Sequence, residues 1–285
     1  MKIKFFLVIL CVIGLSCTRH QQRSPAQGEE WILPAAPKEI ENKIKAEFPG
    51  AMRMSDFADT MISYVGKKYG VQPASMLLGT STCVDDIIYT KDFHAHPEIK
   101  GPFHLGGLAG LPFTGISGLE AFAHHIPEEG AMILLVEPHI GISEQKGWGT
   151  VLRHGQEEAS SCCGALMGAL GKLDRGLLTG DITEDDYQED KIAAITLRHR
   201  DEIKKATLPS VAHTMVMSAE AEQQIMNYVS KVKITHIRYI FIITGVLVNT
   251  DFKYADYQYV EHFMVFDVAQ NTFVEDLRRP FSRPN

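Results

Sequence analysis

The sequence predicts an α/β fold: a single domain with a mainly parallel central sheet flanked by helices, and a β-rich C-terminal part. The first observation is a pair of short apolar runs bounded by turn residues, 75–79 and 131–136, which are typical of buried strands. The second is that helical patterns separate these runs from each other and from the end of the chain. The third is the pair of long β-rich runs near the C-terminus, 237–248 and 257–268.

Two amphipathic segments precede the first strand. Residues 39–48 are expected to be helical, and so are residues 55–69, in which Phe57, Met61, Ile62 and Val65 share one face. Ser55 can cap the start of the second helix, and Gly70 follows its end.

Helices are also expected between the second strand and the C-terminal strands. Residues 161–178, 183–205 and 218–232 carry the patterns that predict them, and the second of these segments is strongly charged. The turn-prone stretch N-T-D-F-K-Y-A-D separates the two C-terminal strands. We predict one domain over residues 38–285.

The N-terminal region is predicted to lie outside this domain. Residues 1–17 combine lysines with an apolar run that is too short to span a membrane, which is typical of a secretory signal peptide. Cys17 follows G-L-S as in a lipoprotein signal, although Gly14 stands where leucine is usual; cleavage without lipidation is the alternative. Residues 18–37 are predicted to be a flexible tether. We therefore expect an exported protein, periplasmic or a membrane-tethered lipoprotein, with a lipid anchor as its only membrane contact.

The charge balance restricts the partners. The 285 residues have a formal net charge of −7 and a pI near 5.9, which argues against nucleic-acid binding because that needs a basic surface. Outside the first 17 residues the chain has three cysteines, Cys83, Cys162 and Cys163. An exported protein normally pairs its cysteines, and an odd number does not allow complete pairing. A metal that keeps thiolates would explain the set.

The positions of two cysteines and one histidine predict a metal site. Cys83 and His139 each follow the C-terminal end of a predicted strand, the edge where open α/β sheets collect ligands. Cys163 stands at the predicted start of a helix, where the helix dipole favours a thiolate. Two cysteines and one histidine leave a fourth position open, as in catalytic zinc sites, so Zn²⁺ is the predicted cofactor.

Other interpretations of the same residues stay open at this point. Buried free cysteines are common packing residues, and a single histidine is often a hydrogen-bonded core residue. Cys162 is the alternative third ligand if the helix begins one residue later. Adjacent Cys162 and Cys163 are also compatible with a thiol redox pair.

Two charged residues are predicted to support the metal site. Asp85 follows Cys83 by two residues, so an extended backbone places both on one side. A carboxylate there can orient a metal-bound water, and Arg153, between His139 and Cys163, is the candidate that holds it ionised. The alternative for Asp85 is a turn or helix-cap residue. His125, in A-F-A-H-H-I-P, is the candidate that lines the pocket and binds substrate or relays a proton.

Six motifs occur in an order that resembles one family. They are G-T-S-T-C-V-D-D-I, F-H-L-G-G-L-A-G-L-P-F-T-G, A-F-A-H-H-I-P-E-E-G, P-H-I-G-I-S, V-L-R-H-G-Q and S-S-C-C-G-A. Together they resemble the limiting-CO2-inducible protein B family, the theta-class carbonic anhydrases, over residues 75 to about 170.

This resemblance implies a β-carbonic-anhydrase-like catalytic domain, zinc held by Cys83, His139 and Cys163, and a homodimer. In the β class an arginine follows the first cysteine by four residues, but Ile87 stands there in this chain, and Arg153 is our candidate replacement. The implied function is reversible hydration of CO2 to bicarbonate. The alternatives are a non-catalytic CO2/bicarbonate-binding protein on the same scaffold, the thiol redox protein, and a metal-dependent hydrolase.

Overall fold

The structure is a computed structural model that describes residues 33–88 and 96–276. The predicted signal peptide and the predicted tether up to residue 32 lie outside the described residues. Within the described ranges, no helix is both long and apolar enough to cross a membrane.

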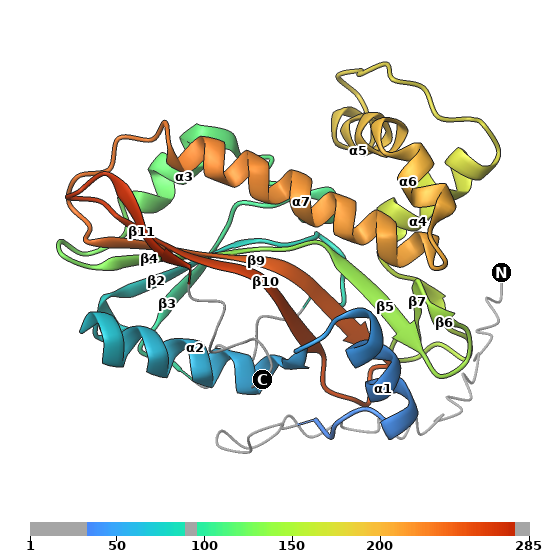
Figure 1. The fold of residues 1–285 in the computed structure, drawn as a ribbon, viewed down its shortest axis with the longest axis horizontal. Coiled ribbons are helices and arrows are strands. Elements are labelled where there is room, and N and C mark those ends of the chain that lie inside the picture. The colour runs from blue at the N-terminus through green and yellow to red at the C-terminus, as the bar shows by residue number, and fades with distance from the viewer. Residues whose placement is uncertain (1–32, 89–95, 277–285) are drawn as a thin grey trace, which may run out of the picture. The chain divides into compact units, whose positions relative to one another are not determined.

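A mixed, mostly parallel sheet forms the centre of the fold (Figure 1). The strand order is β1-β10-β9-β4-β2-β3, and neighbours in the run β9-β4-β2-β3 are parallel, whereas β10 is antiparallel to β9. The strands are β1 Met52–Arg53, β2 Met76–Ser81, β3 Lys100–His104, β4 Ala131–Val136, β5 His139–Ser143, β6 Gly147–Trp148, β7 Thr150–Val151, β8 Ser160–Ser161, β9 Tyr239–Thr250, β10 Tyr257–Asp267 and β11 Thr272–Asp276. The predicted fold class is confirmed.

Helices cover both faces of this sheet (Figure 1). α2 lies on one face, and α3 and α7 lie on the other. The helices are α1 Lys38–Glu47, α2 Met54–Tyr69, α3 Gly115–Ala123, α4 Gly164–Asp174, α5 Tyr187–Arg198, α6 Arg200–Lys205 and α7 Pro209–Val229.

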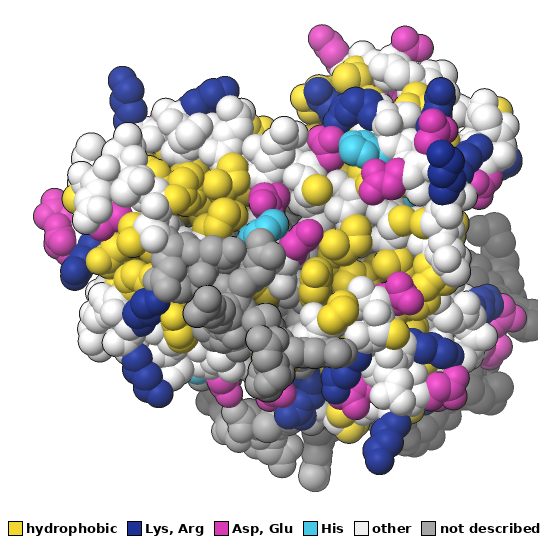
Figure 2. All heavy atoms as spheres, viewed as in Figure 1, with side chains coloured by type: hydrophobic (Ala, Val, Ile, Leu, Met, Phe, Trp, Pro, Cys, Tyr) yellow, Lys and Arg dark blue, Asp and Glu magenta, His cyan; other side chains and the backbone are white. Residues whose placement is uncertain are grey.

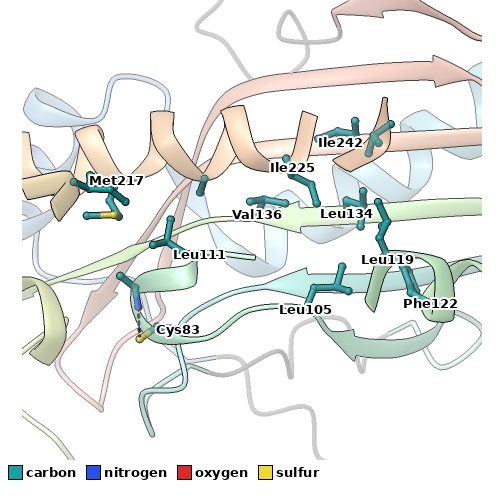
Figure 3. Packing of buried hydrophobic residues seen from close by; sticks show 14 of the residues in the cluster. Cys83, Leu105, Leu111, Leu119, Phe122, Leu134, Val136, Met217, Ile225 and Ile242 are labelled. Carbon is teal, nitrogen blue, oxygen red and sulfur yellow. Dashed lines mark hydrogen bonds between the residues drawn. The ribbon is translucent and has the colours of Figure 1, made fainter. Parts of the chain in front are cut away.

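The apolar run of β4 is continuous because both of its faces are covered. Successive side chains of a strand point to opposite faces, so Ile133 and Leu135 join the cluster under α2, whereas Leu134 and Val136 join the cluster under α7 (Figure 3). Cys83 lies at the end of this second cluster. The core therefore extends up to the edge where the candidate site begins.

The sequence placed several boundaries wrongly. The helix predicted over 161–178 covers only Gly164–Asp174, because Ser160 and Ser161 form β8. The helix predicted over 183–205 is divided at His199 into α5 and α6, and the one predicted over 218–232 starts at Pro209. A proline in the first helical turn lacks only an N–H that would be unpaired there.

Charges of both signs are mixed over the surface. On the face shown in Figure 2, lysine and arginine side chains alternate with aspartates and glutamates, and the described residues form no continuous basic surface there.

His213 is a buried titratable residue in the helical layer. Its Nε2–H donates to Thr196 Oγ1 (2.8 Å), and Thr196 in turn donates to Ile192 O. The Nδ1 atom is buried and has no hydrogen-bond partner among the described residues. Burial lowers the pKa of His213 to about 4, since a charged imidazole would lose its hydration.

The lowered pKa of His213 predicts that the free energy of unfolding decreases in acid. The folded pKa lies below the ordinary value of 6.5, so the unfolded chain binds the proton first as the pH falls. Stability should decrease from about pH 6.5 down to about pH 4, by roughly 3 kcal/mol in total. Urea unfolding of the wild type and of His213→Gln at several pH values measures it. The variant should lose this part of the pH dependence, whereas the exposed-site control His154→Gln should keep it; equal pH dependence in wild type and His213→Gln would contradict the prediction.

Candidate metal centre

Two parallel strands end at the same edge of the sheet and deliver the first two candidate ligands. β2 ends at Ser81, and Cys83 follows two residues later. β4 ends at Val136, and His139 is the first residue of β5, which pairs in parallel with the end of β9. The C-terminal ends of parallel strands commonly form ligand sites. Both side chains are buried, with exposed fractions of 6% for Cys83 and 1% for His139.

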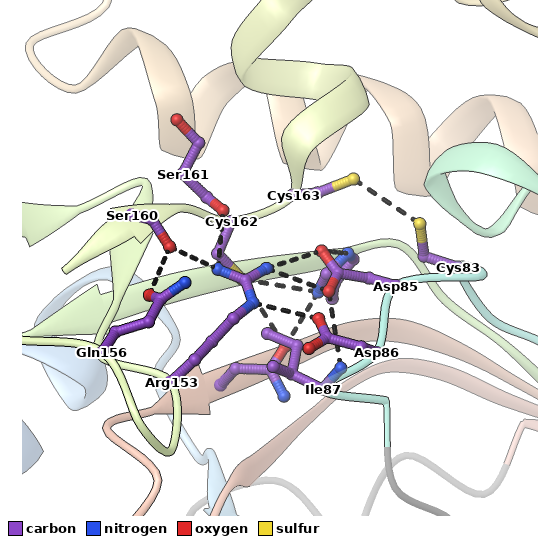
Figure 4. A network of polar contacts seen from close by, with 12 residues as sticks. Cys83, Asp85, Asp86, Ile87, Arg153, Gln156, Ser160, Ser161, Cys162 and Cys163 are labelled. Carbon is purple, nitrogen blue, oxygen red and sulfur yellow. Dashed lines mark hydrogen bonds and ion pairs between the residues drawn. The ribbon is translucent and has the colours of Figure 1, made fainter. Parts of the chain in front are cut away.

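The third candidate ligand comes from the start of a helix. Cys163 is the N-cap residue of α4, and its Sγ lies 3.6 Å from Cys83 Sγ (Figure 4). One ligand atom from each of Cys83, His139 and Cys163 can be chosen so that all three lie within 4.8 Å of one another. The structure thus brings together the three residues that the sequence indicated.

A glycine-rich loop encloses Cys83. A Cβ atom on Gly106 would lie 2.3 Å from Thr82 O, and one on Gly110 would lie 2.1 Å from Glu137 O. The loop can therefore press against the segments that follow β2 and β4 only because these positions lack side chains. In this position the backbone N–H of Ala109 donates to Cys83 Sγ (3.3 Å; Figure 3). That hydrogen bond favours a thiolate at Cys83.

A hydrogen-bonded chain fixes the orientation of His139. Its Nδ1 lies 2.8 Å from Asn249 Oδ1, and the Asn249 amide donates to Asp256 Oδ2 at 2.9 Å. Because Asp256 fixes which end of the amide is the acceptor, Nδ1 must carry the proton. In the neutral imidazole, the lone pair of His139 is therefore on Nε2.

His139 Nε2 is a buried atom without a hydrogen-bond partner among the described residues. An unpartnered buried nitrogen is costly unless something binds it. Together with two sulfur atoms 3.6 Å apart, it fits a tetrahedral cation. A zinc ion with sulfur ligands at about 2.3 Å would place the two sulfurs about 3.8 Å apart. The residues present therefore fit a metal ion.

In the metal-free chain, the three candidate ligands differ in protonation. The Cys163 thiol donates to Cys83, and with the nearby His139 this lowers the pKa of Cys83 to about 4. The same Cys83 contact and burial raise the pKa of Cys163 well above its ordinary value. Burial opposes a charge on His139, but the neighbouring sulfur atoms, Cys163 first, outweigh it and raise the pKa of His139. One thiolate, one thiol and one imidazolium thus share the metal-free site.

Cys162 occupies a different place from Cys163. Its Sγ lies 3.6 Å from His139 Nδ1 and 3.8 Å from Asn249 Oδ1, on the side of the imidazole that Asn249 already occupies. Burial raises the pKa of Cys162, which disfavours a thiolate. The two adjacent sulfurs have different neighbours: Cys163 groups with Cys83 and His139, whereas Cys162 groups with Asp85 and His139. Only the first group has two sulfur ligands. None of these three cysteines is in a disulfide.

Asp85 and Arg153 form a bidentate ion pair beside the ligands (Figure 4). Arg153 Nη2 lies 2.9 Å from Asp85 Oδ1 and 3.1 Å from Oδ2, and Asp85 Oδ2 is 3.8 Å from His139 Nε2. Arg153 is held by Asp86 through Nε (3.0 Å) and by Ser160 through Nη1 (2.8 Å). Burial opposes ionisation of Asp85, but Asp86 and Arg153 outweigh it and lower the pKa of Asp85. The carboxylate is therefore charged and fixed in direction.

A cavity of about 180 Å³ opens beside Cys83 and Asp85. Thr80 and Thr82 of the β2 segment line it, together with His104, the last residue of β3. His125, which the sequence indicates as the pocket histidine, is not among the residues that line this cavity or form the candidate metal group. It follows the C-terminal end of α3 and is exposed, and its ring centroid lies 5.8 Å from that of Phe103.

Sequence reasoning missed the residues that position the ligands. Asn249 and Asp256 lie in N-T-D-F-K-Y-A-D, which the sequence marks only as a turn between two strands. Their role depends on β5 pairing with β9, which places His139 opposite Leu247. Strand β3, which carries His104, was also not predicted because its glycine and proline resemble a loop.

The fold and the site together define an α/β protein with a candidate metal centre of two cysteines and one histidine at the carboxyl edge of its sheet. The chain belongs to the family of limiting CO2-inducible proteins B/C beta carbonic anhydrases, whose family model matches residues 51–267. The family resemblance of the six motifs is confirmed.

Solved structures of related proteins agree with this membership. The crystal structure of PtLCIB4, a homolog of the limiting CO2-inducible protein LCIB, is 25% identical, with 83% of this chain and 99% of that chain covered and a TM-score of 0.72. The crystal structure of LCIB itself is 18% identical, with 82% and 97% covered and a TM-score of 0.61, which supports the fold. No curated protein matched the chain.

The protonation of the metal-free site predicts proton release when a metal binds. At neutral pH Cys83 is already a thiolate, but Cys163 and His139 must each lose a proton before they can coordinate. We expect about two protons released per zinc ion near pH 7, and affinity that falls as the pH decreases. Calorimetric titration of zinc in buffers with different ionisation enthalpies measures the number. Release of no protons would contradict this description of the site.

The Asn249 contact predicts an effect on metal affinity without any change of ligand. Asn249→Leu removes the acceptor for His139 Nδ1–H, so the imidazole loses its fixed orientation, and zinc affinity should fall about 10- to 100-fold. Competition with a chromophoric zinc chelator measures the affinity. Asn227→Leu, on the exposed surface of α7, is the matched control and should bind zinc like the wild type. Equal affinities in the two variants would contradict a positioning role for Asn249.

Proposed function

We propose that this protein is a zinc-dependent carbonic anhydrase that interconverts CO2 and water with bicarbonate and a proton. The observation that carries the proposal is that Cys83, His139 and Cys163 have ligand atoms within 4.8 Å of one another, beside the ionised Asp85. Membership of the LCIB/LCIC β-carbonic anhydrase family supports the same reaction.

Zinc is the metal that the donor set favours. Two thiolates and one imidazole are soft and borderline donors, which suit Zn²⁺ better than Mg²⁺ or Ca²⁺. Three protein ligands leave a fourth position for water or substrate. When bound by these three residues, zinc would supply a hydroxide nucleophile near neutral pH, because it lowers the pKa of a water molecule in the fourth position.

In this proposal, Asp85 directs the attacking water. Its Oδ2 is 3.8 Å from His139 Nε2, so the carboxylate borders the place where the ligands converge. An ionised carboxylate accepts a hydrogen bond and turns the oxygen lone pair of that water toward CO2. A protonated carboxyl group would donate instead, so Asp85 must stay charged to perform this role.

Arg153 is proposed to keep Asp85 charged and fixed. Its bidentate contact with both carboxylate oxygens stabilises the ionised form and prevents rotation of the carboxylate. The Ser160 and Asp86 contacts hold the guanidinium itself. Arg153 lies 68 residues after Asp85 in the chain. It thus supplies the positive charge that an arginine at the position of Ile87 would otherwise supply.

The cavity beside Cys83 and Asp85 is the proposed path for CO2 and bicarbonate. Its volume of about 180 Å³ suits small molecules, which favours CO2 over the larger substrates of a hydrolase. The different neighbours of the Cys162 and Cys163 sulfurs disfavour the thiol redox pair. We also propose that the protein is a homodimer, as the family resemblance implies; sedimentation velocity tests this part separately.

Stopped-flow CO2 hydration with metal analysis tests the proposed function. The wild type should contain one zinc per chain and hydrate CO2, with a rate that rises from about pH 7 to pH 9, because two thiolates donate more charge to zinc than imidazoles do. Cys83→Ser should lose zinc and activity together. Asp85→Asn should keep zinc but lose at least about 100-fold in kcat/KM, whereas the exposed control Asp181→Asn should match the wild type.

The outcomes separate the alternatives. A wild type that holds zinc but does not hydrate CO2 between pH 7 and pH 9 would overturn the proposal. Retained bicarbonate binding in that inert protein would instead support a non-catalytic CO2/bicarbonate-binding protein.

A further inference from the structure

The proposed reaction releases a proton for every bicarbonate formed, and the groups next to the candidate metal centre are poorly suited to remove it. Both carboxylate oxygens of Asp85 are occupied by Arg153 Nη2, at 2.9 and 3.1 Å. His139 is itself a candidate ligand, and its Nδ1 contacts Asn249. A separate group that exchanges protons near neutral pH is needed, and imidazole is the side chain suited to this.

His104 is the histidine that lines the same cavity as Cys83 and Asp85. It ends β3, and the parallel register with β2 places it opposite Thr80, three residues before Cys83. The Leu105 N–H donates to Thr80 O at 2.8 Å, so strand pairing continues directly past His104. The backbone therefore fixes the position of the imidazole at the mouth of the site.

The hydrogen bond of His104 suits a residue that gains and loses a proton. Its Nδ1 lies 3.3 Å from Thr80 Oγ1, and a hydroxyl group can either donate or accept. This contact is therefore kept in both the neutral and the charged imidazole. Within the described part of the chain, Nε2 has no hydrogen-bond partner, and the side chain is exposed to solvent. Nε2 is thus free to exchange protons between the cavity and bulk water.

Other histidines do not share this position. His96 is paired with Asp59 at 2.7 Å, and His125 follows the far end of α3. His199 lies between α5 and α6 and is paired with Glu202 and Glu220. Asp85 is the charged side chain that lines the cavity with His104.

We propose that His104 is the proton-transfer residue of this site. In the hydration direction, CO2 and water form bicarbonate, and the released proton passes through cavity water to His104 Nε2. The imidazolium then gives this proton to a buffer base in solvent, which restores neutral His104. In the dehydration direction the proton moves the opposite way. This inference rests on the proposed carbonic anhydrase function.

Exchange of ¹⁸O between CO2 and water, measured together with stopped-flow hydration, tests the assignment. In zinc-loaded His104→Ala, kcat at low buffer concentration should fall about tenfold, while kcat/KM for CO2 should stay within about twofold, because only proton transfer is removed. Added imidazole should restore kcat in this variant. His104→Gln, which can keep the Thr80 contact, should behave like His104→Ala. The control His199→Ala should match the wild type.

Zinc content and nuclear magnetic resonance test the role of His104 without measuring turnover. Zinc content should be equal in wild type and both His104 variants. In nuclear magnetic resonance spectra of the zinc-loaded protein with labelled histidine, the His104 ring signals should shift on addition of bicarbonate, whereas those of His199 should not.

The same measurements distinguish a failure of the proposed function from a failure of the His104 assignment. Wild type without ¹⁸O exchange would overturn the proposed function and this inference with it. Exchange in the wild type with unchanged kcat in His104→Ala, an equal loss of kcat and kcat/KM, or no rescue by imidazole would overturn the role of His104 alone.

Discussion

The site depends on one constraint: two sulfur atoms and one imidazole nitrogen must lie together in a buried place. Cys83 Sγ and Cys163 Sγ are 3.6 Å apart, and one ring nitrogen of His139 lies within 4.8 Å of both. His139 Nε2 has no hydrogen-bond partner among the described residues. Gathering such groups away from water is unfavourable unless protons or a cation neutralise the thiolates. The metal-free chain uses shared protons for this purpose, and a bound metal ion would replace them. The same atoms therefore account for both the unusual protonation and the proposed binding of zinc.

The rest of the fold holds these atoms in place. Parallel strands β2 and β4 end at one edge of the sheet, and a loop whose glycines allow backbone contact closes over Cys83. The β9–β10 hairpin contributes Asn249 and Asp256, which set the protonated nitrogen of His139. Arg153 performs the corresponding task for Asp85. His139 and Asp85 are thus each oriented by a second residue from another part of the chain, as in sites that require exact geometry.

The sequence predicted what local patterns encode. The apolar runs at 75–79 and 131–136 indicated β2 and β4, and the carboxyl-edge rule then placed Cys83 and His139 together. It could not predict contacts that arise only from tertiary pairing. Asn249 reaches His139 because β5 pairs with β9, and His104 reaches the cavity because β3 pairs with β2. The sequence indicated His125 rather than His104 because a position before a strand carries no information about which cavity the side chain lines.

The central claim is that Cys83, His139 and Cys163 hold one zinc ion and leave one position open. X-ray absorption spectroscopy at the zinc edge of the full-length protein tests it most directly. The account predicts two sulfur scatterers at about 2.3 Å and two nitrogen or oxygen scatterers at about 2.0–2.1 Å, one of them exchangeable. A shell of four sulfur or four nitrogen and oxygen atoms, or a protein that does not retain zinc, would contradict it.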